Sequence, residues 1–224
     1  MTELPTLTDP RDILARYEAA LANDQLTQGG WHSTAEDGRW LACALGVIGD
    51  KVASPRDCPA SVMPRWLAQA VPVFFDRQKP DDAKNWGLRF YKALADCGGS
   101  VPFAAVHYWH AHTVCPLGIE NSQKRKHDDA PHKDLQAMHL RALAGEKIAE
   151  DEWRSVLKNA YAGATADAAA YAAAAYADAA AAAYAAADAA AADAAYAAAD
   201  ADAKVWKRLA DGMVDAINAT ANIG

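Results

Sequence analysis

The sequence predicts an all-α protein, with a multi-helix domain followed by a long alanine-rich C-terminal helix. Signals that start and stop helices recur along its 224 residues, whereas strand signals are almost absent. From Ala166 to Ala203, 28 of 38 residues are alanine and the others are only tyrosine and aspartate. Alanine has the highest helix propensity of all residues. We expect residues 1–149 to form the helical domain, and residues 150–218 to form an alanine-rich helical region that packs on it or on a second chain.

The first three helices are predicted from caps and prolines. Thr8-Asp9-Pro10 provides a cap and a first-turn proline for a helix over residues 12–22. Ser33 and Glu36 have the spacing of a capping box, which predicts a second helix over residues 39–53. The third helix begins near Cys58-Pro59 or at Pro64, and Pro72 is expected to end or kink it.

The next three helices are bounded by equally clear signals. Asp81 is expected to cap a helix that stops at Gly98-Gly99. Pro102 opens a fifth helix, in which Pro116 predicts a kink. The polar turn KRKHDDAPH precedes a sixth helix, which stops at Gly145.

Two amphipathic segments flank the alanine tract. Residues 150–162 begin the last helical region. Its far end spaces Val205, Leu209, Met213 and Ile217 four residues apart, which predicts an apolar stripe that needs a surface to cover it.

The alanine tract itself is interpreted as a helix with a narrow face suited to close packing. Its packing partner is either the protein's own helices or the same tract in a second chain, which would give a homodimer. A tyrosine-lined recognition surface is the alternative. DNA mimicry is excluded because six aspartates over roughly 57 Å give about one charge per 10 Å, against about one per 1.7 Å in a duplex.

Charge and composition exclude several functional classes. The net charge is −7, and six aspartates of the tract account for −6 of it, so the rest of the chain is near −1 with no basic stripe. Nucleic-acid binding is therefore not expected. No segment has the pattern of a signal peptide or of a membrane span. The four cysteines (Cys43, Cys58, Cys97 and Cys115) lack CxxC spacing and are interpreted as small buried thiols of a cytoplasmic protein.

Several predicted helices place cationic or hydrogen-bonding groups beside large aromatic side chains. If these helices surround one concavity, the residues could stack a flat ring and clamp an anion. The alternative is that each tryptophan points into the core while its neighbouring arginine points into solvent. The candidate ligand-binding residues are Arg39, Trp40, Arg65, Trp66, Trp86, Arg89, Tyr91, His107, Trp109 and His110.

Histidines form the second candidate constellation. His107, His110 and His112 fall within six residues, and His132 and His139 lie on the next predicted helix. A helical hairpin could bring them together around zinc, whereas core or surface hydrogen bonding explains them without a metal. No motif for nucleophilic catalysis or phosphate binding is present. The protein is therefore expected to be no enzyme, with no metal or other cofactor.

The segment VPVFFDRQKPDDAKNWGLRFYKAL, followed by an alanine-rich tract, resembles a family of helical immunity proteins found in phage and bacterial conflict systems. The resemblance covers residues 60–200 and departs from the family in its tract, which carries aspartate and tyrosine where basic residues and histidine are expected. It implies a protective role but does not identify what is neutralised.

The resulting functional prediction is a non-catalytic binding protein that neutralises a toxin or a defence component by occupancy. One alternative is a phage sponge that sequesters a small nucleotide immune signal in an Arg/Trp/His pocket. The other is a histidine-metal enzyme. Docking of a protein partner predicts an exposed apolar or tyrosine patch, whereas a sponge predicts a pocket containing arginine and stacked aromatic rings.

Overall fold

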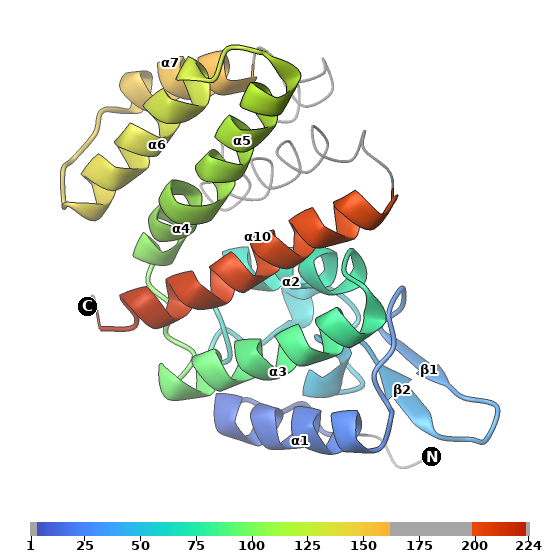
Figure 1. The fold of residues 1–224 in the computed structure, drawn as a ribbon. Helices are drawn as coiled ribbons and strands as arrows, with labels where there is room; N and C mark the ends of the chain where they lie inside the picture. The colour runs from blue at the N-terminus through green and yellow to red at the C-terminus, as the bar shows by residue number, and fades with distance from the viewer. Residues whose placement is uncertain (1–3, 162–198, 223–224) are drawn as a thin grey trace. The chain divides into compact units, whose positions relative to one another are not determined.

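The computed structural model describes residues 4–161 and 199–222 and confirms the all-α class (Figure 1). The chain folds as two compact units, Met1–Val101 and Pro102–Gly224, which we call the first and second units. The C-terminal helix is present as α10 (Ala199–Thr220). Most of the predicted alanine helix lies outside the described residues, so the predicted division into residues 1–149 and 150–218 stays a prediction.

The first unit begins with α1 (Pro10–Ala22), which starts where its cap predicts. The side chain of Asp9 accepts a hydrogen bond from the backbone N–H of Arg11, and Pro10 occupies the first helical turn. Ile13, Tyr17 and Ala20 form its buried face.

The predicted helix over residues 39–53 is wrong. Strands β1 (His32–Thr34) and β2 (Trp40–Ala42) pair there as an antiparallel hairpin, followed by the short 3₁₀ helix η1 (Gly46–Ile48). The hairpin turns at Asp37-Gly38, where Gly38 has φ +83° and the Asp37 carboxylate accepts the N–H of Arg39. Asp-Gly is a preferred hairpin turn, and the pairing of the two strands through it prevents the helix that the capping-box spacing predicts.

Two longer helices complete this unit after the short 3₁₀ helix η2 (Pro55–Asp57). Helix α2 (Arg65–Asp76) begins after Pro64 as predicted and continues past Pro72, so this proline does not end it. Burial of Phe74 and Phe75 beyond the proline offsets the stability that is lost because Pro72 cannot donate a backbone hydrogen bond. Helix α3 (Pro80–Asp96) has Lys79 rather than Asp81 at its cap position, and Gly98 and Gly99 follow its end with positive φ.

Helices α1 and α3 lie side by side and hold an aromatic core (Figure 1). The Tyr17 and Tyr91 ring centroids are 5.3 Å apart, and Trp86 stacks on Phe90 at 4.9 Å. The Tyr17 hydroxyl donates to the carbonyl of Lys84, 3.0 Å away, and the Tyr91 hydroxyl to that of Ala44, 2.6 Å away. These bonds satisfy both phenols inside the core.

Gly87 makes this close approach feasible, because a Cβ at position 87 would overlap the hydroxyl group and ring of Tyr17. We predict that Gly87→Ala lowers the free energy of unfolding by about 1–3 kcal/mol, the usual cost of overpacking a core. Gly30→Ala is the matched control, since nothing lies within 4 Å of its added Cβ. Urea unfolding of both variants tests this, and equal midpoints would show that Tyr17 moves aside without cost.

The second unit opens with one helical segment of three parts. Helix α4 (Ala104–Trp109) continues into a π-helical turn (η3, His110–Val114) and then into α5 (Cys115–Arg125). Pro116 lies in the first turn of α5, so the distortion predicted at this proline occurs as the π turn just before it. Single π turns inside α-helices are often found at functional sites.

The described part of the second unit contains three further helices: α6 (Ala130–Leu143), α7 (Glu150–Tyr161) and α10. Gly145, with φ +86°, follows α6 as predicted. Of the predicted stripe of α10, Leu209, Met213 and Ile217 are buried, and Val205 is half-buried. Helix α10 packs on α4, where the Trp109 indole N–H donates to the carbonyl of Leu209, 2.8 Å away.

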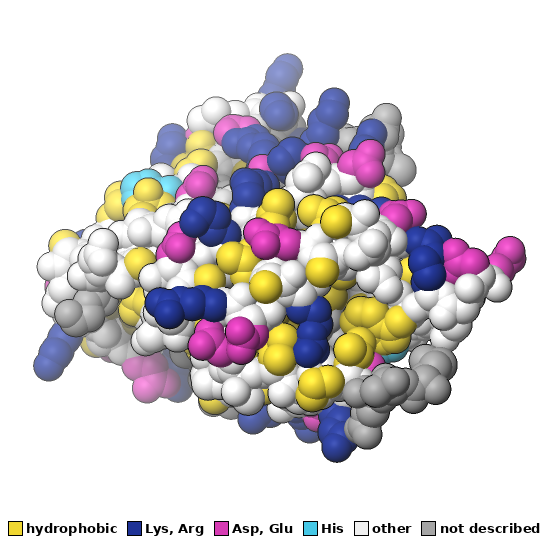
Figure 2. Space-filling view, turned by 90° about the horizontal axis from the view of Figure 1, so that it is seen from below, with side chains coloured by type: hydrophobic (Ala, Val, Ile, Leu, Met, Phe, Trp, Pro, Cys, Tyr) yellow, Lys and Arg dark blue, Asp and Glu magenta, His cyan; other side chains and the backbone are white. Residues whose placement is uncertain are grey.

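Within the described ranges, no helix is both long and apolar enough to cross a membrane. On the face shown in Figure 2, cationic and acidic side chains are interspersed, with small apolar areas between them. That face therefore carries no extended patch of one charge.

Candidate functional site

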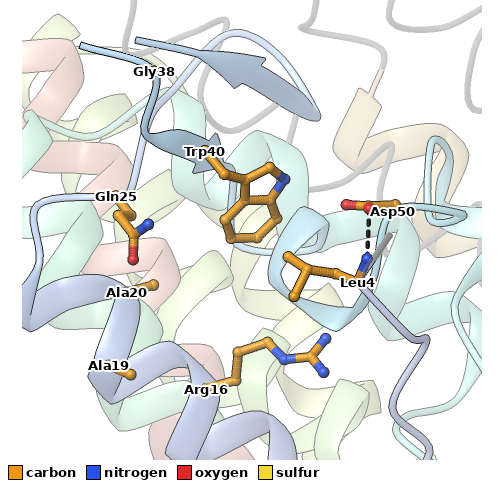
Figure 3. A pocket seen from close by; sticks show the side chains of 8 residues that line it. All are labelled: Leu4, Arg16, Ala19, Ala20, Gln25, Gly38, Trp40 and Asp50. Atoms are coloured by element: carbon orange, nitrogen blue, oxygen red, sulfur yellow. Dashed lines mark hydrogen bonds between the residues drawn. The ribbon is translucent and has the colours of Figure 1, made fainter. Parts of the chain in front are cut away.

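A cavity of about 400 Å³ lies in the first unit, between the N-terminal segment, α1 and the β-hairpin (Figure 3). Helix α1 contributes one wall, the Trp40 indole projects into the space, and the N-terminal segment lies opposite α1. The lining residues are Leu4, Arg16, Ala19, Ala20, Gln25, Gly38, Trp40 and Asp50.

Arg16 fixes the base of this cavity. Its Nη1 donates to three backbone carbonyls: Pro5 at 2.9 Å, Val47 at 3.2 Å and Ile48 at 3.1 Å. These bonds attach the N-terminal segment and η1 to helix α1. Partial burial lowers the pKa of Arg16, although an arginine side chain stays charged in proteins.

Two further polar groups complete the lining. The Asp50 carboxylate accepts the backbone N–H of Leu4 at 2.7 Å. Gln25 uses its backbone to pair with Ala20 and Ala42, and its side-chain amide bonds to none of the residues that the structure describes. The cavity thus presents one cation, one anion and one amide.

Trp40 supplies the aromatic surface. Its ring stacks on His32, with centroids 5.8 Å apart and planes 28° apart, and the Nε2 atom of His32 lies 3.0 Å from the carbonyl oxygen of Gly46. The indole Nε1 of Trp40 is buried and has no hydrogen-bond partner among the described residues. A buried donor without a partner costs about 1–3 kcal/mol.

Of the ten residues proposed from sequence, Trp40 alone lines this cavity. The Arg39 side chain turns outward, bonding Asp37 at 2.6 Å and the carbonyl of Asn23 at 2.9 Å. The others fall into three groups by position. Arg65 and Arg89 are exposed and Trp66 is half-buried, Trp86 and Tyr91 lie in the core of the first unit, and His107, Trp109 and His110 belong to the second unit.

Arg16 and Gln25 were not identified from sequence as site residues. Arg16 stands alone between apolar residues of an amphipathic helix, and Gln25 belongs to the connection that follows it. Only the hairpin brings Trp40 over them, and the sequence pattern predicts a helix at that position.

The second unit brings together three of the five histidines proposed as a constellation from the sequence. The Nδ1 atoms of His107 and His139 lie 3.0 Å apart, so one ring donates to the other. The rings of His110 and His139 stack with centroids 4.4 Å apart and planes 14° apart. Trp153 of α7 stacks on His107 at 5.7 Å and also contacts the ring of His139. We call His107, His110 and His139 the imidazole cluster.

Burial keeps the imidazole cluster neutral. Desolvation lowers the pKa of His107 and of His139, and it lowers the pKa of His110 to about 3. The Nδ1 atom of His110 and the Nε2 atom of His139 are buried without partners in the described structure. Of the other two histidines, His112 is exposed and His132 lies against Gly118.

Across the described segments, no three His, Cys, Asp or Glu side chains are arranged to hold a metal ion. The imidazole cluster therefore has no geometric support as a metal centre. All four cysteines are free thiols, of which Cys43 and Cys115 are buried as predicted and Cys58 and Cys97 are half-buried. Burial raises the pKa of the Cys115 thiol to about 12, which leaves it a poor nucleophile.

Comparisons with protein-family models, with curated proteins and with solved structures find no match to this chain.

Proposed function

We propose that this protein is a non-catalytic binding protein of a phage or bacterial conflict system, which sequesters a small nucleotide-type ligand in the cavity of the first unit. The observation that carries the proposal is the convergence of Trp40, Arg16, Gln25 and Asp50 on one cavity of about 400 Å³. The conflict-system context comes from the family resemblance of the sequence.

Size and chemistry support a small ligand. Pockets for small molecules span roughly 300–1,000 Å³ and combine apolar walls with a few orienting polar groups. Here Leu4, Ala19 and Ala20 provide apolar wall, while an indole ring offers a stacking surface. Stacking of a base on an aromatic side chain contributes about 1–3 kcal/mol.

Docking of a protein partner has less support on the described surface. The large hydrophobic side chains exposed there are Phe103 and Leu140, at 39% and 44%. Protein-binding surfaces usually present contiguous apolar patches of several hundred Å². The cavity therefore favours the sponge over the docking version of the function.

The proposal predicts that nucleotides bind the full chain and that Trp40→Ala weakens binding by about 5- to 150-fold, the range that corresponds to loss of one stacking contact. Isothermal titration calorimetry with a panel of mono- and cyclic dinucleotides measures this. Native mass spectrometry of protein expressed in a bacterial host would reveal a copurified ligand.

Trp66→Ala is the matched control, since Trp66 lies in the same unit but does not line the cavity. We expect it to bind like wild type. Binding lost in Trp66→Ala but kept in Trp40→Ala overturns the site assignment. If no nucleotide of the panel binds and the same protein preparation captures a protein partner, the function is docking of that partner and the sponge is overturned.

A further inference from the structure

We infer that the cavity recognises an adenine base and leaves the phosphate groups of its ligand outside. The inference rests on the proposed function, because it names which part of a nucleotide enters the cavity. It follows from the charge balance of the lining, from its hydrogen-bonding groups and from the position of Trp40.

The charges of the lining do not suit a phosphate. Arg16 is the one cationic residue among the lining residues, and its Nη1 already donates to three carbonyl oxygens. The Asp50 carboxylate also lines the cavity and adds a negative charge that opposes an anion. Phosphate sites usually combine several cationic or backbone N–H donors, whereas here the lining offers the Nε and Nη2 atoms of one arginine, beside a carboxylate. The net charge of the lining is zero, which suits a neutral group.

The hydrogen-bonding groups match the edge of a base. The Gln25 amide carries both a donor and an acceptor, and it bonds to no other residue that the structure describes. A glutamine amide can pair bidentately with the amino group and the ring nitrogen N7 of adenine. Asp50 can accept a second hydrogen bond from an amino group, since the Leu4 N–H occupies only its Oδ2 atom.

Trp40 provides the stacking face. His32 covers one side of the indole, so a planar base would stack on the opposite side. Gly38 lines the cavity next to it in the hairpin and adds no side chain that would obstruct the base.

The test compares adenosine, AMP, inosine and inorganic phosphate in calorimetric titrations of the full chain. We expect adenosine and AMP to bind within about threefold of each other, because the phosphate makes no contact. Inosine, which lacks the amino group, should bind at least about tenfold more weakly, as expected when a polar group of the site loses its partner. Millimolar phosphate should not compete, and affinity should change less than about twofold between low and high salt.

Gln25→Glu keeps the size of the side chain but removes its donor, and it should weaken adenosine binding at least about tenfold. Asn85→Asp, an equivalent change at an exposed position of α3, should leave the affinity unchanged. If AMP binds far more tightly than adenosine and phosphate competes with it, the proposed function stands and base recognition is overturned. Equal binding of inosine and adenosine also overturns it. Failure of every nucleoside and nucleotide to bind removes the proposed function itself.

Discussion

At pH 5 the second unit is expected to be at least about 2 kcal/mol less stable than at pH 7.5, because it buries the imidazole cluster in the neutral state. His110 is 2% exposed and His139 is 6% exposed, and no carboxylate is hydrogen-bonded to either ring in the described structure. A proton added to either ring would therefore be buried without a compensating charge.

The sign of the effect follows from the direction of the pKa shift. The pKa of His110 is lowered from 6.5 to about 3 by burial, so below pH 6.5 the unfolded chain binds a proton that the folded chain does not. Stability is then complete above the ordinary pKa and falls as the pH decreases, by about 1.4 kcal/mol per pH unit for each group. At pH 5, His110 alone lowers the free energy of unfolding by about 2 kcal/mol. His139, whose pKa is lowered by the same cause, adds a loss of the same sign.

The ion-paired carboxylate of Glu146 titrates at lower pH and does not account for this effect. Arg141 of α6 pairs with Glu146 and with Glu152 of α7, and this pairing lowers the pKa of Glu146. Glu146 therefore stays ionised at pH 5. The loss between pH 7.5 and pH 5 is therefore assigned to histidine.

Hydrogen exchange with peptide resolution, corrected for intrinsic rates, measures the effect at pH 7.5 and pH 5. Protection in α4, α6 and α7 should fall, while protection in α1 and α3 of the first unit should not. His110→Gln should reduce the pH dependence to the share of His139, and the exposed His112→Gln should leave it as in wild type. Equal protection of α6 at the two pH values would mean that the imidazole cluster takes up protons without opening.

The elements that were predicted correctly are determined by residues close together in the sequence. The start of α1 at Asp9-Pro10, the glycines after α3 and the stripe of α10 are each read within one or two turns of helix. The hairpin at residues 32–42 is different, because its second strand also bonds to the segment after α1, through the N–H of Ala42 and the carbonyl of Gln25. Residues 42–49 are buried on all sides, so their apolar pattern cannot distinguish a helix from a buried turn.

Prediction of the site is also limited, because its residues come together through contacts between segments that are distant in the sequence. Pairing of arginine with tryptophan along the chain selected Arg39-Trp40, and Trp40 does line the cavity while Arg39 turns outward. The arginine that lines the same cavity as Trp40 is Arg16, 24 positions earlier in the sequence. By contrast, His107, His110 and His139 come together because a hairpin of two adjacent helices is a short-range feature that the sequence shows.

Trp109→Ala is expected to be the most destabilising single substitution considered for the second unit, with a loss of about 3–5 kcal/mol, the range for truncating a buried tryptophan. The side chain is 1% exposed, and its indole N–H donates to the carbonyl of Leu209 across the contact between α4 and α10. Truncation leaves a large cavity at the point where α10 is attached. We therefore expect α10 to lose hydrogen-exchange protection before the rest of the unit.

Two further variants separate the contribution of the apolar volume of Trp109 from that of its hydrogen bond and provide a control. Trp109→Phe keeps most of the apolar volume but loses the hydrogen bond, so it should lose clearly less stability than Trp109→Ala. Leu140→Ala, at an exposed position of α6, should cost well under 1 kcal/mol. A Trp109→Ala protein with wild-type stability would show that α10 does not depend on this contact. Trp109 is also one of the candidate ligand-binding residues from the sequence. The cavity that carries the proposed function belongs entirely to the first unit, so we expect Trp109→Ala to bind nucleotides with wild-type affinity. That result would show that Trp109 stabilises the fold and does not contact the ligand.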